Sequence, residues 1–266
     1  MMMLLLIINI YDELSGLLHV FLAALLKLRY YDQDNKRILI LDMENIKAQF
    51  NSVSKKYDGQ RKFLIPRLDD FYTCCTPIIK TLSTAKKVLD IGAGTGLFTQ
   101  YIYQQRNDLH FTLTDISTDM LAVAKERFAG LDNFEFGEYD FTSGPIKEKY
   151  DLIISALAIH HLEDAQKASL YQYVFDALND GGVFINADQV EGRTQWFDSY
   201  YKSNWKQTVI NSGLEQTAID NAFERIKLDR FGKLETQLQM LEKAGFPETD
   251  CIYKSNNFAV MAAFKV

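Results

Sequence analysis

VLDIGAGTG, residues 88–96, is the stretch of this 266-residue chain that decides its fold. An apolar run from Val88 to Ile91 passes directly into a turn with glycines at 92, 94 and 96. Glycine allows a sharp turn and lets a ligand approach the main chain closely. In open α/β sheets, ligands bind at such strand ends. The candidate ligand-binding residues of this loop are Asp90, Gly92, Ala93, Gly94 and Gly96.

Apolar runs and helical patterns alternate on the carboxyl side of this loop. Fully apolar strands that alternate with helices indicate a parallel sheet covered on both faces. Two late runs, 251–254 and 258–264, are separated by only three residues and therefore predict an antiparallel hairpin. A turn is expected at 179–182. The other expected strands are 87–91, 110–115, 134–139, 151–156 and 183–187, with helices at 97–105, after Ser117 or Thr118, and at 165–178.

A second acid, Asp115, closes the next strand, nineteen residues after Gly96. A carboxylate there can accept hydrogen bonds from both hydroxyls of a ribose that lies across the strand ends. A dinucleotide site would need the pattern G-x-G-x-x-G, but Leu97 stands where the third glycine belongs. Asp90 would repel a pyrophosphate and attract a cofactor that carries an ammonium and a sulfonium.

VLDIGAGTG resembles motif I of the class I methyltransferases that depend on S-adenosylmethionine (SAM). FTLTDIS, GEYDFTS, YDLIISALAIHHLED and GGVFINAD resemble the later motifs and follow in the family's order from 111 to 188. The match covers roughly residues 43–266. It is similar to the small-molecule type (methyltransferase domain 25/11-like). The cofactor residues that this resemblance adds are Asp115 for the ribose, Ile116, Met120, Asp140 and Phe141 near the adenine, and Ala156.

This resemblance implies an α/β fold with a Rossmann-like, doubly wound sheet of seven strands, mostly parallel, with the last strand antiparallel. It also implies an enzyme that transfers a methyl group from SAM to an O, N, S or C nucleophile of a small-molecule acceptor, with S-adenosylhomocysteine (SAH) as the product.

His160 and His161 follow the fourth strand, where the family's substrate meets the methyl group. One of them could act as a base, because imidazole titrates near neutral pH. The alternative is that they hydrogen-bond the loop or cap the next helix. The family's tetrapeptide for amine methylation is missing, since residues 155–158 read SALA. This absence argues against methylation of adenine N6 or glutamine.

Two segments do not follow the alternation of strands and helices. Residues 43–84 resemble N-terminal lid helices, in which Tyr57 and Arg61 share one face and would contact the cofactor's carboxylate end or the substrate. Residues 191–234 form a helical insertion that we expect to cap the site. Tyr72, Trp196 and Tyr200 are expected to wall the substrate pocket, although aromatic stripes at helical spacing are more often plain core.

Composition sets further limits. The net charge of −6 argues against a nucleic-acid partner. Residues 1–42 hold two apolar runs, each shorter than the ~18–20 residues of a bilayer span, so no integral membrane span is expected. The domain itself is expected to begin at Met43, where the sequence becomes ordinary in composition. Three cysteines without metal-ligand spacing suggest reduced thiols, no metal and a cytoplasmic location. A homodimer remains open.

Three alternatives stay open beside methyl transfer: an NAD-dependent oxidoreductase, a SAM-binding protein without activity, and a carboxy-SAM synthase. The last rests on residues 235–246 and 257–265, which resemble the C-terminal stretch of those synthases. There an arginine of the insertion holds a carboxylate, and Arg193 is the candidate here.

Overall fold

The computed structural model describes residues 57–266 of the chain. The apolar leader expected at 1–42 and the first part of the expected lid lie outside the described residues. Within residues 57–266, no helix combines the length and the apolar character that a membrane crossing requires.

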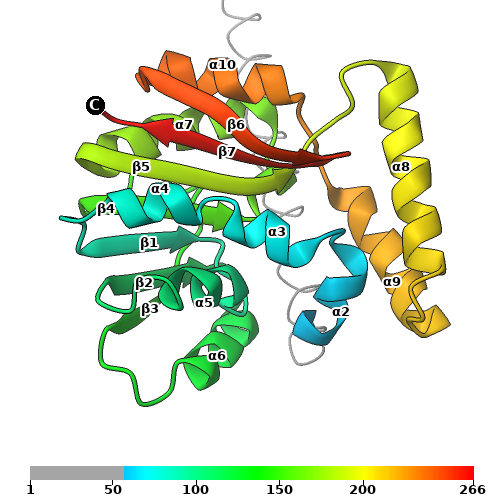
Figure 1. Ribbon diagram of the computed structural model, residues 1–266, viewed down its shortest axis with the longest axis horizontal. Coiled ribbons are helices and arrows are strands. Elements are labelled where there is room, and N and C mark those ends of the chain that lie inside the picture. Colours follow the sequence, from blue (N-terminus) through cyan, green and yellow to red (C-terminus); the bar gives the residue numbers. More distant parts are fainter. Residues whose placement is uncertain (1–56) are drawn as a thin grey trace, which may run out of the picture. The chain divides into compact units, whose positions relative to one another are not determined.

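Seven strands form one sheet in the order β3-β2-β1-β4-β5-β7-β6 (Figure 1). Six strands run in one direction, and β7 is antiparallel to both of its neighbours, β5 and β6. The expected fold class is therefore confirmed, including the terminal hairpin. The strands are β1 (Lys87–Ile91), β2 (His110–Asp115), β3 (Phe134–Glu138), β4 (Tyr150–Ala156), β5 (Leu178–Gln189), β6 (Glu248–Ser255) and β7 (Phe258–Phe264).

One expected turn is wrong. Residues 179–182 belong to β5, which begins five residues earlier than its apolar run. The Gly181 N–H donates to the Lys265 carbonyl at 2.6 Å, and the Lys265 N–H donates to the Gly182 carbonyl at 2.9 Å. The end of the chain therefore pairs with this polar, glycine-rich segment, which short-range sequence patterns cannot reveal.

Helices cover both faces of the sheet (Figure 1). One face packs against α3 (Leu68–Thr73), α4 (Thr76–Thr81), α5 (Leu97–Tyr103) and α6 (Thr118–Arg127). The other packs against α7 (Asp164–Ala177) and α10 (Leu234–Ala244). Ser117 caps α6, because its side chain accepts a hydrogen bond from the Met120 N–H at 3.1 Å. Burial on both sides explains why β1, β4 and β5 read as continuous apolar runs.

The remaining helices gather beyond the carboxyl ends of the parallel strands, at the right of Figure 1. They are α2 (Tyr57–Leu64), α8 (Gln195–Ile210), α9 (Gln216–Arg225) and the short η3 (Ile226–Leu228), while η2 (Ile159–His161) follows β4. The Trp205 indole N–H of α8 donates to the Leu64 carbonyl of α2 at 2.8 Å. This bond ties the insertion to the N-terminal helices over the end of the sheet.

Candidate functional site

The three glycines of the β1 loop all adopt positive φ, between 56° and 75°, but they differ in what surrounds them. A Cβ at Gly92 would collide with the Cβ of Ala158, and one at Gly96 would lie 2.7 Å from Phe128. A Cβ at Gly94 would meet nothing within 4 Å. Gly92 and Gly96 are thus required by packing, whereas Gly94 presents bare main chain to open space, as a ligand cradle needs.

Asp115 lies at the end of β2 beside this loop. Its carboxylate accepts hydrogen bonds from the N–H groups of Gly94 and Ser117, both at 2.8 Å. Burial raises the pKa of Asp115, and these N–H donors oppose that rise. The acid therefore fixes the glycine loop against the start of α6, and we expect its remaining acceptor positions to face the ribose hydroxyls.

Asp90 is buried at the end of β1. One carboxylate oxygen accepts a hydrogen bond from the Thr99 hydroxyl at 2.5 Å, and the other, Oδ1, has no partner among the described residues. Burial raises the pKa of Asp90 to about 7, with the Thr99 bond opposing and the Asp115 charge adding to the rise. A buried carboxylate oxygen without a donor fits the ammonium group of SAM.

Binding of SAH should depend on pH through Asp90. The ionised carboxylate is the form that attracts the ligand's ammonium, and in the free protein this form becomes dominant only above about pH 7. Affinity should therefore rise as pH increases through 7, by about tenfold for each pH unit below that value, and then level off. Calorimetric titrations across this range test the expectation. Asp90→Asn should bind weakly with a flat profile, and an equally flat profile in the unmodified protein would contradict it.

Loss of the Asp115 carboxylate should weaken SAH binding without unfolding the protein. Asp115→Ala removes a charged acceptor at a strand end, so we expect affinity to fall by about 10- to 100-fold. Titration calorimetry measures the affinity, and the thermal melting temperature checks the fold. Asp119→Ala, an exposed acid in the first turn of α6, is the matched control. Unchanged affinity in Asp115→Ala would remove Asp115 from the cofactor site.

The other expected cofactor residues lie at the same edge of the sheet. Asp140 accepts hydrogen bonds from the Thr142 N–H at 2.8 Å and its hydroxyl at 2.7 Å, so it closes the turn after β3. Phe141 and Met120 are 7% and 1% exposed, so each offers little surface to an adenine. Three residues keep partial exposure at the strand ends, namely Ala93, Ile116 and Ala156.

Asp58 of α2 joins the N-terminal helices to the glycine loop. Its carboxylate accepts a hydrogen bond from the Thr95 hydroxyl at 2.6 Å and pairs with Arg127 of α6. Arg127 also donates to the Thr95 carbonyl at 2.8 Å. Sequence reasoning missed this link, because three residues far apart in the chain make it. The side chain of Tyr57 lies outside the described residues.

A cavity of about 500 Å³, a volume that includes its mouth to solvent, lies among η2, the end of β5, α2, α8, α9 and η3. Its polar lining comes from Arg61, His160, His161, Gln189, Arg225 and Asp229. Its apolar lining comes from Leu64, Ile65, Leu157, Trp205, Ala222 and Ile226. Burial lowers the pKa of Arg61 to about 10.

The two histidines stand in different environments. The Nδ1 of His160 lies 2.5 Å from Asp188 of β5, and its Nε2 lies 3.5 Å from Asp229. His161 places its own Nδ1 3.3 Å from the same Asp229 oxygen. Burial alone would lower the pKa of His160, but the two carboxylates raise it to about 10. Burial and the neighbouring His160 charge lower the pKa of His161. His160 is thus held as a cation and His161 as a neutral imidazole.

His160, His161 and Asp229 offer three ligand atoms within 4.8 Å of one another, a spacing that a metal ion could accept. The surrounding charges oppose this use. Arg61 and Arg225 line the same cavity, and a dication there would be repelled by both guanidinium groups. The arrangement suits proton transfer better than metal binding.

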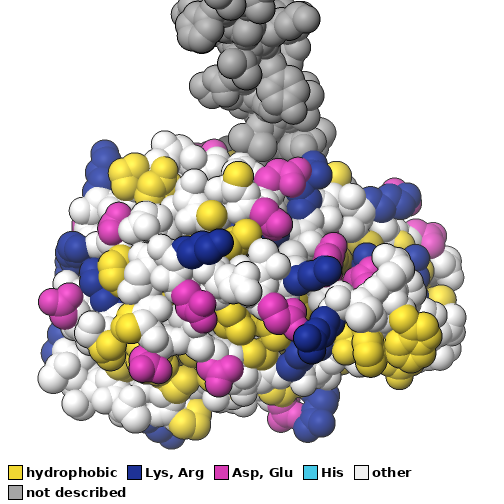
Figure 2. All heavy atoms as spheres, turned by 90° about the horizontal axis from the view of Figure 1, so that it is seen from above, with side chains coloured by type: hydrophobic (Ala, Val, Ile, Leu, Met, Phe, Trp, Pro, Cys, Tyr) yellow, Lys and Arg dark blue, Asp and Glu magenta, His cyan; other side chains and the backbone are white. Residues whose placement is uncertain are grey.

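Two aromatic residues expected in the pocket wall are not there. Trp196 and Tyr200 are 67% and 48% exposed, stack on each other at 5.4 Å, and do not line the cavity. Hydrophobic side chains gather at the α8 end of the molecule in Figure 2. Trp205 of the same helix takes their place, because residues nine positions apart on a helix point about 180° apart. The expectation for Trp196 and Tyr200 is therefore corrected.

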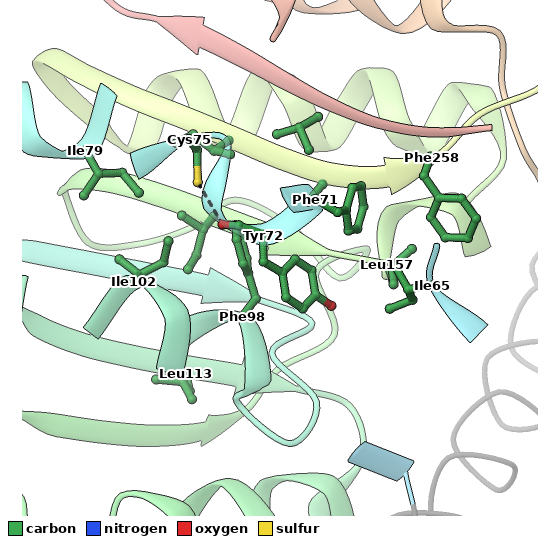
Figure 3. Packing of buried hydrophobic residues seen from close by; sticks show 14 of the residues in the cluster. Ile65, Phe71, Tyr72, Cys75, Ile79, Phe98, Ile102, Leu113, Leu157 and Phe258 are labelled. Carbon is green, nitrogen blue, oxygen red and sulfur yellow. Dashed lines mark hydrogen bonds between the residues drawn. The ribbon is translucent and has the colours of Figure 1, made fainter. Parts of the chain in front are cut away.

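Tyr72 does not line the cavity either. Its ring packs between Phe71 at 5.3 Å and Phe98 at 4.9 Å in the hydrophobic core, as Figure 3 shows. Its backbone carbonyl accepts a weak hydrogen bond from the Cys75 thiol at 3.5 Å. Burial raises the pKa of Tyr72 to about 12, so its hydroxyl stays protonated.

Arg193, the candidate carboxylate-binding arginine of the insertion, points away from the cavity. Its side chain is 83% exposed and its Nε lies 3.6 Å from Glu235. Arg225, which sequence reasoning did not select, is the arginine of the insertion that lines the cavity. A single sequence does not show which arginine of the insertion lines the cavity.

Comparison with known proteins agrees with this geometry. A family model described as a methyltransferase domain matches residues 89–184, which hold the glycine loop, Asp115 and the histidine pair. Residues 89–184 are therefore a methyltransferase domain, and their motifs resemble those of the class I SAM-dependent enzymes. SAM is accordingly its cofactor, and the buried Asp90 oxygen without a donor and the bare main chain at Gly94 are compatible with that molecule.

Curated relatives of this methyltransferase carry different activities. Malonyl-[acyl-carrier protein] O-methyltransferase 1 of Ilyobacter polytropus is 27% identical over 146 residues, 54% of this chain and 51% of the relative. The chain thus spans about half the length of that relative. Carboxy-S-adenosyl-L-methionine synthase of Nautilia profundicola is 23% identical over 235 residues, 83% of this chain and 96% of the relative.

Solved structures share the methyltransferase fold. DhpI in complex with SAM and HEP superposes with a TM-score of 0.58 at 18% identity, covering 83% of this chain and 96% of that one. Human N-acetylserotonin methyltransferase in complex with SAM gives 0.51 at 18% identity, covering 81% and 58%. At these identities the likeness concerns the fold alone.

Proposed function

We propose that this methyltransferase transfers the methyl group of SAM to a protonated nucleophile of a small-molecule acceptor, with His161 as the base. The single observation that carries the proposal is the placement of a neutral His161 beside Asp229 in a cavity after β4. The cavity is lined on several sides by apolar residues, and the carboxyl ends of the strands form its floor. A small molecule fits this volume better than a nucleic acid, since acidic and basic side chains are mixed on the surface in Figure 2.

SAM, when bound, supplies a methyl group that its sulfonium already activates. The protein's part is then to align the acceptor, exclude water and remove one proton. His160 is unsuited to accept that proton, because both of its ring nitrogens face carboxylates and act as donors. Asp229 orients His161 through Nδ1 and stabilises the imidazolium that forms, so Nε2 is the nitrogen that takes the acceptor's proton.

Asp188 and His160 position the base. The Asp188 carboxylate also accepts a hydrogen bond from the His160 backbone N–H at 3.0 Å, which fixes η2 to the end of β5. The Arg230 N–H donates to the His160 carbonyl at 2.7 Å and holds the segment after Asp229 against the same turn. The two elements that carry the base and its partner are therefore joined by main-chain bonds.

Carboxy-SAM synthesis is a second candidate, since the relative with that activity aligns over 96% of its length. One assay separates the two. Purified protein is incubated with SAM and a mixture of small hydroxylated compounds, amine-bearing compounds and carboxylic acids that lose CO2 readily and can act as carboxyl donors, and the products are analysed by mass spectrometry. Methyl transfer yields SAH and an acceptor heavier by one methylene. Carboxy-SAM synthesis yields SAM heavier by one carboxyl group and no methylated acceptor, an outcome that would replace our proposal.

A further inference from the structure

Arg225, the last residue of α9, is a cation without a partner in the described part of the chain. Its side chain is half-buried and lines the cavity beside Ala222 and Ile226. No hydrogen bond or ion pair within 4 Å joins its guanidinium to another described residue. Burial lowers the pKa of Arg225, and Asp229 offsets this in part. A half-buried guanidinium without a carboxylate contact is costly, unless a ligand supplies the anion.

The nearest carboxylates are already engaged. Asp229 faces both histidines at 3.3 and 3.5 Å, and Asp188 faces His160 at 2.5 Å. Neither carboxylate is therefore left to form a close ion pair with Arg225. Arg225 ends α9, in the insertion, and lines the same cavity as His161.

We propose that the acceptor carries an oxyanion, a carboxylate or a phosphate, and that Arg225 binds it. The inference rests on the proposed function and adds the chemical class of its substrate. Arginine suits this task, because its planar fork binds a carboxylate or phosphate through two parallel hydrogen bonds. The acceptor's body lies against Leu157 and Trp205, and its nucleophile lies at His161.

Binding of three probes with the same ring tests the proposal: benzoate, phenyl phosphate and neutral benzamide. Each is titrated into the protein saturated with SAH, and affinity is measured by calorimetry. We expect at least one anion to bind ten-fold or more tightly than benzamide. Which anion binds better distinguishes a carboxylate from a phosphate acceptor.

Arg225→Gln should remove this preference and leave SAH affinity unchanged. Lys227→Gln is the matched control, since Lys227 lies two residues away, is exposed and pairs with Glu224 at 2.6 Å. It should behave like the unmodified protein. Arg225→Lys keeps the positive charge but not the planar guanidinium group, so it should retain only part of the preference for anions over benzamide.

Two results would overturn the proposal. One is the lack of any difference among the three probes, including binding by none of them. The other is an anion preference that survives Arg225→Gln. Failure of SAH itself to bind would be a different result, because it would contradict the proposed function rather than the role of Arg225.

Discussion

Gly94→Val is expected to abolish SAH binding, with a loss of affinity of about 100-fold or more. A side chain at this position would occupy the open space that faces the loop's main chain, where we expect the cofactor to bind. Isothermal titration with SAH measures the loss. Gly94→Ala, with a smaller side chain, should lose less.

Strain is the competing explanation for such a result, because Gly94 has a φ of 56° that valine tolerates poorly. Gly130→Val is the matched control. Gly130 also has positive φ, 84°, and also has nothing within 4 Å of a built Cβ, but it lies in the loop after α6. The control should lose stability comparably and keep its SAH affinity. Normal SAH binding by Gly94→Val would mean that the loop is not the cofactor site.

His161→Ala is expected to lower kcat by roughly 10²- to 10⁴-fold with an acceptor found by the screen, while SAH affinity stays unchanged. The variant lacks the group that removes the acceptor's proton. Its rate should recover as pH rises toward the acceptor's own pKa, because the acceptor then arrives ionised. Steady-state kinetics against pH test both statements.

His110→Ala is the control for this variant, since His110 is exposed at the opposite end of β2. It should leave kcat unchanged. Asp229→Asn should reproduce most of the loss, because it removes the negative charge that stabilises the protonated His161. If His161→Ala keeps full activity at all pH values, the base has been assigned wrongly, and the pair serves to shape the η2 turn.

The fold could be predicted from local patterns, because each central strand is buried on both faces and reads as a continuous apolar run. β1, β2 and β7 were predicted with their observed bounds. The start of β5 was missed, since its polar residues are held by the distant Lys265. Local patterning does not contain that information.

The site could be predicted in part. Spacing predicted that the glycine loop and Asp115 lie together, and the structure joins them through the hydrogen bond from the Gly94 N–H to Asp115. The chemistry of the histidine pair depends on Asp188 of β5 and on Asp229, the residue after η3, and neither carries a motif of its own. Trp196 was predicted to line the pocket because aromatic residues are dense around it. In the structure, the face of α8 that carries Trp196 is exposed to solvent, and Trp205 is buried instead.

The most direct test of the account is a calorimetric titration of the purified protein with SAH, with NAD as the paired control. The account predicts micromolar binding of SAH and no binding of NAD, because Leu97 replaces the third glycine of a dinucleotide loop and Asp90 opposes a pyrophosphate. Binding of NAD without SAH would contradict it, and with it the assignment of the cofactor.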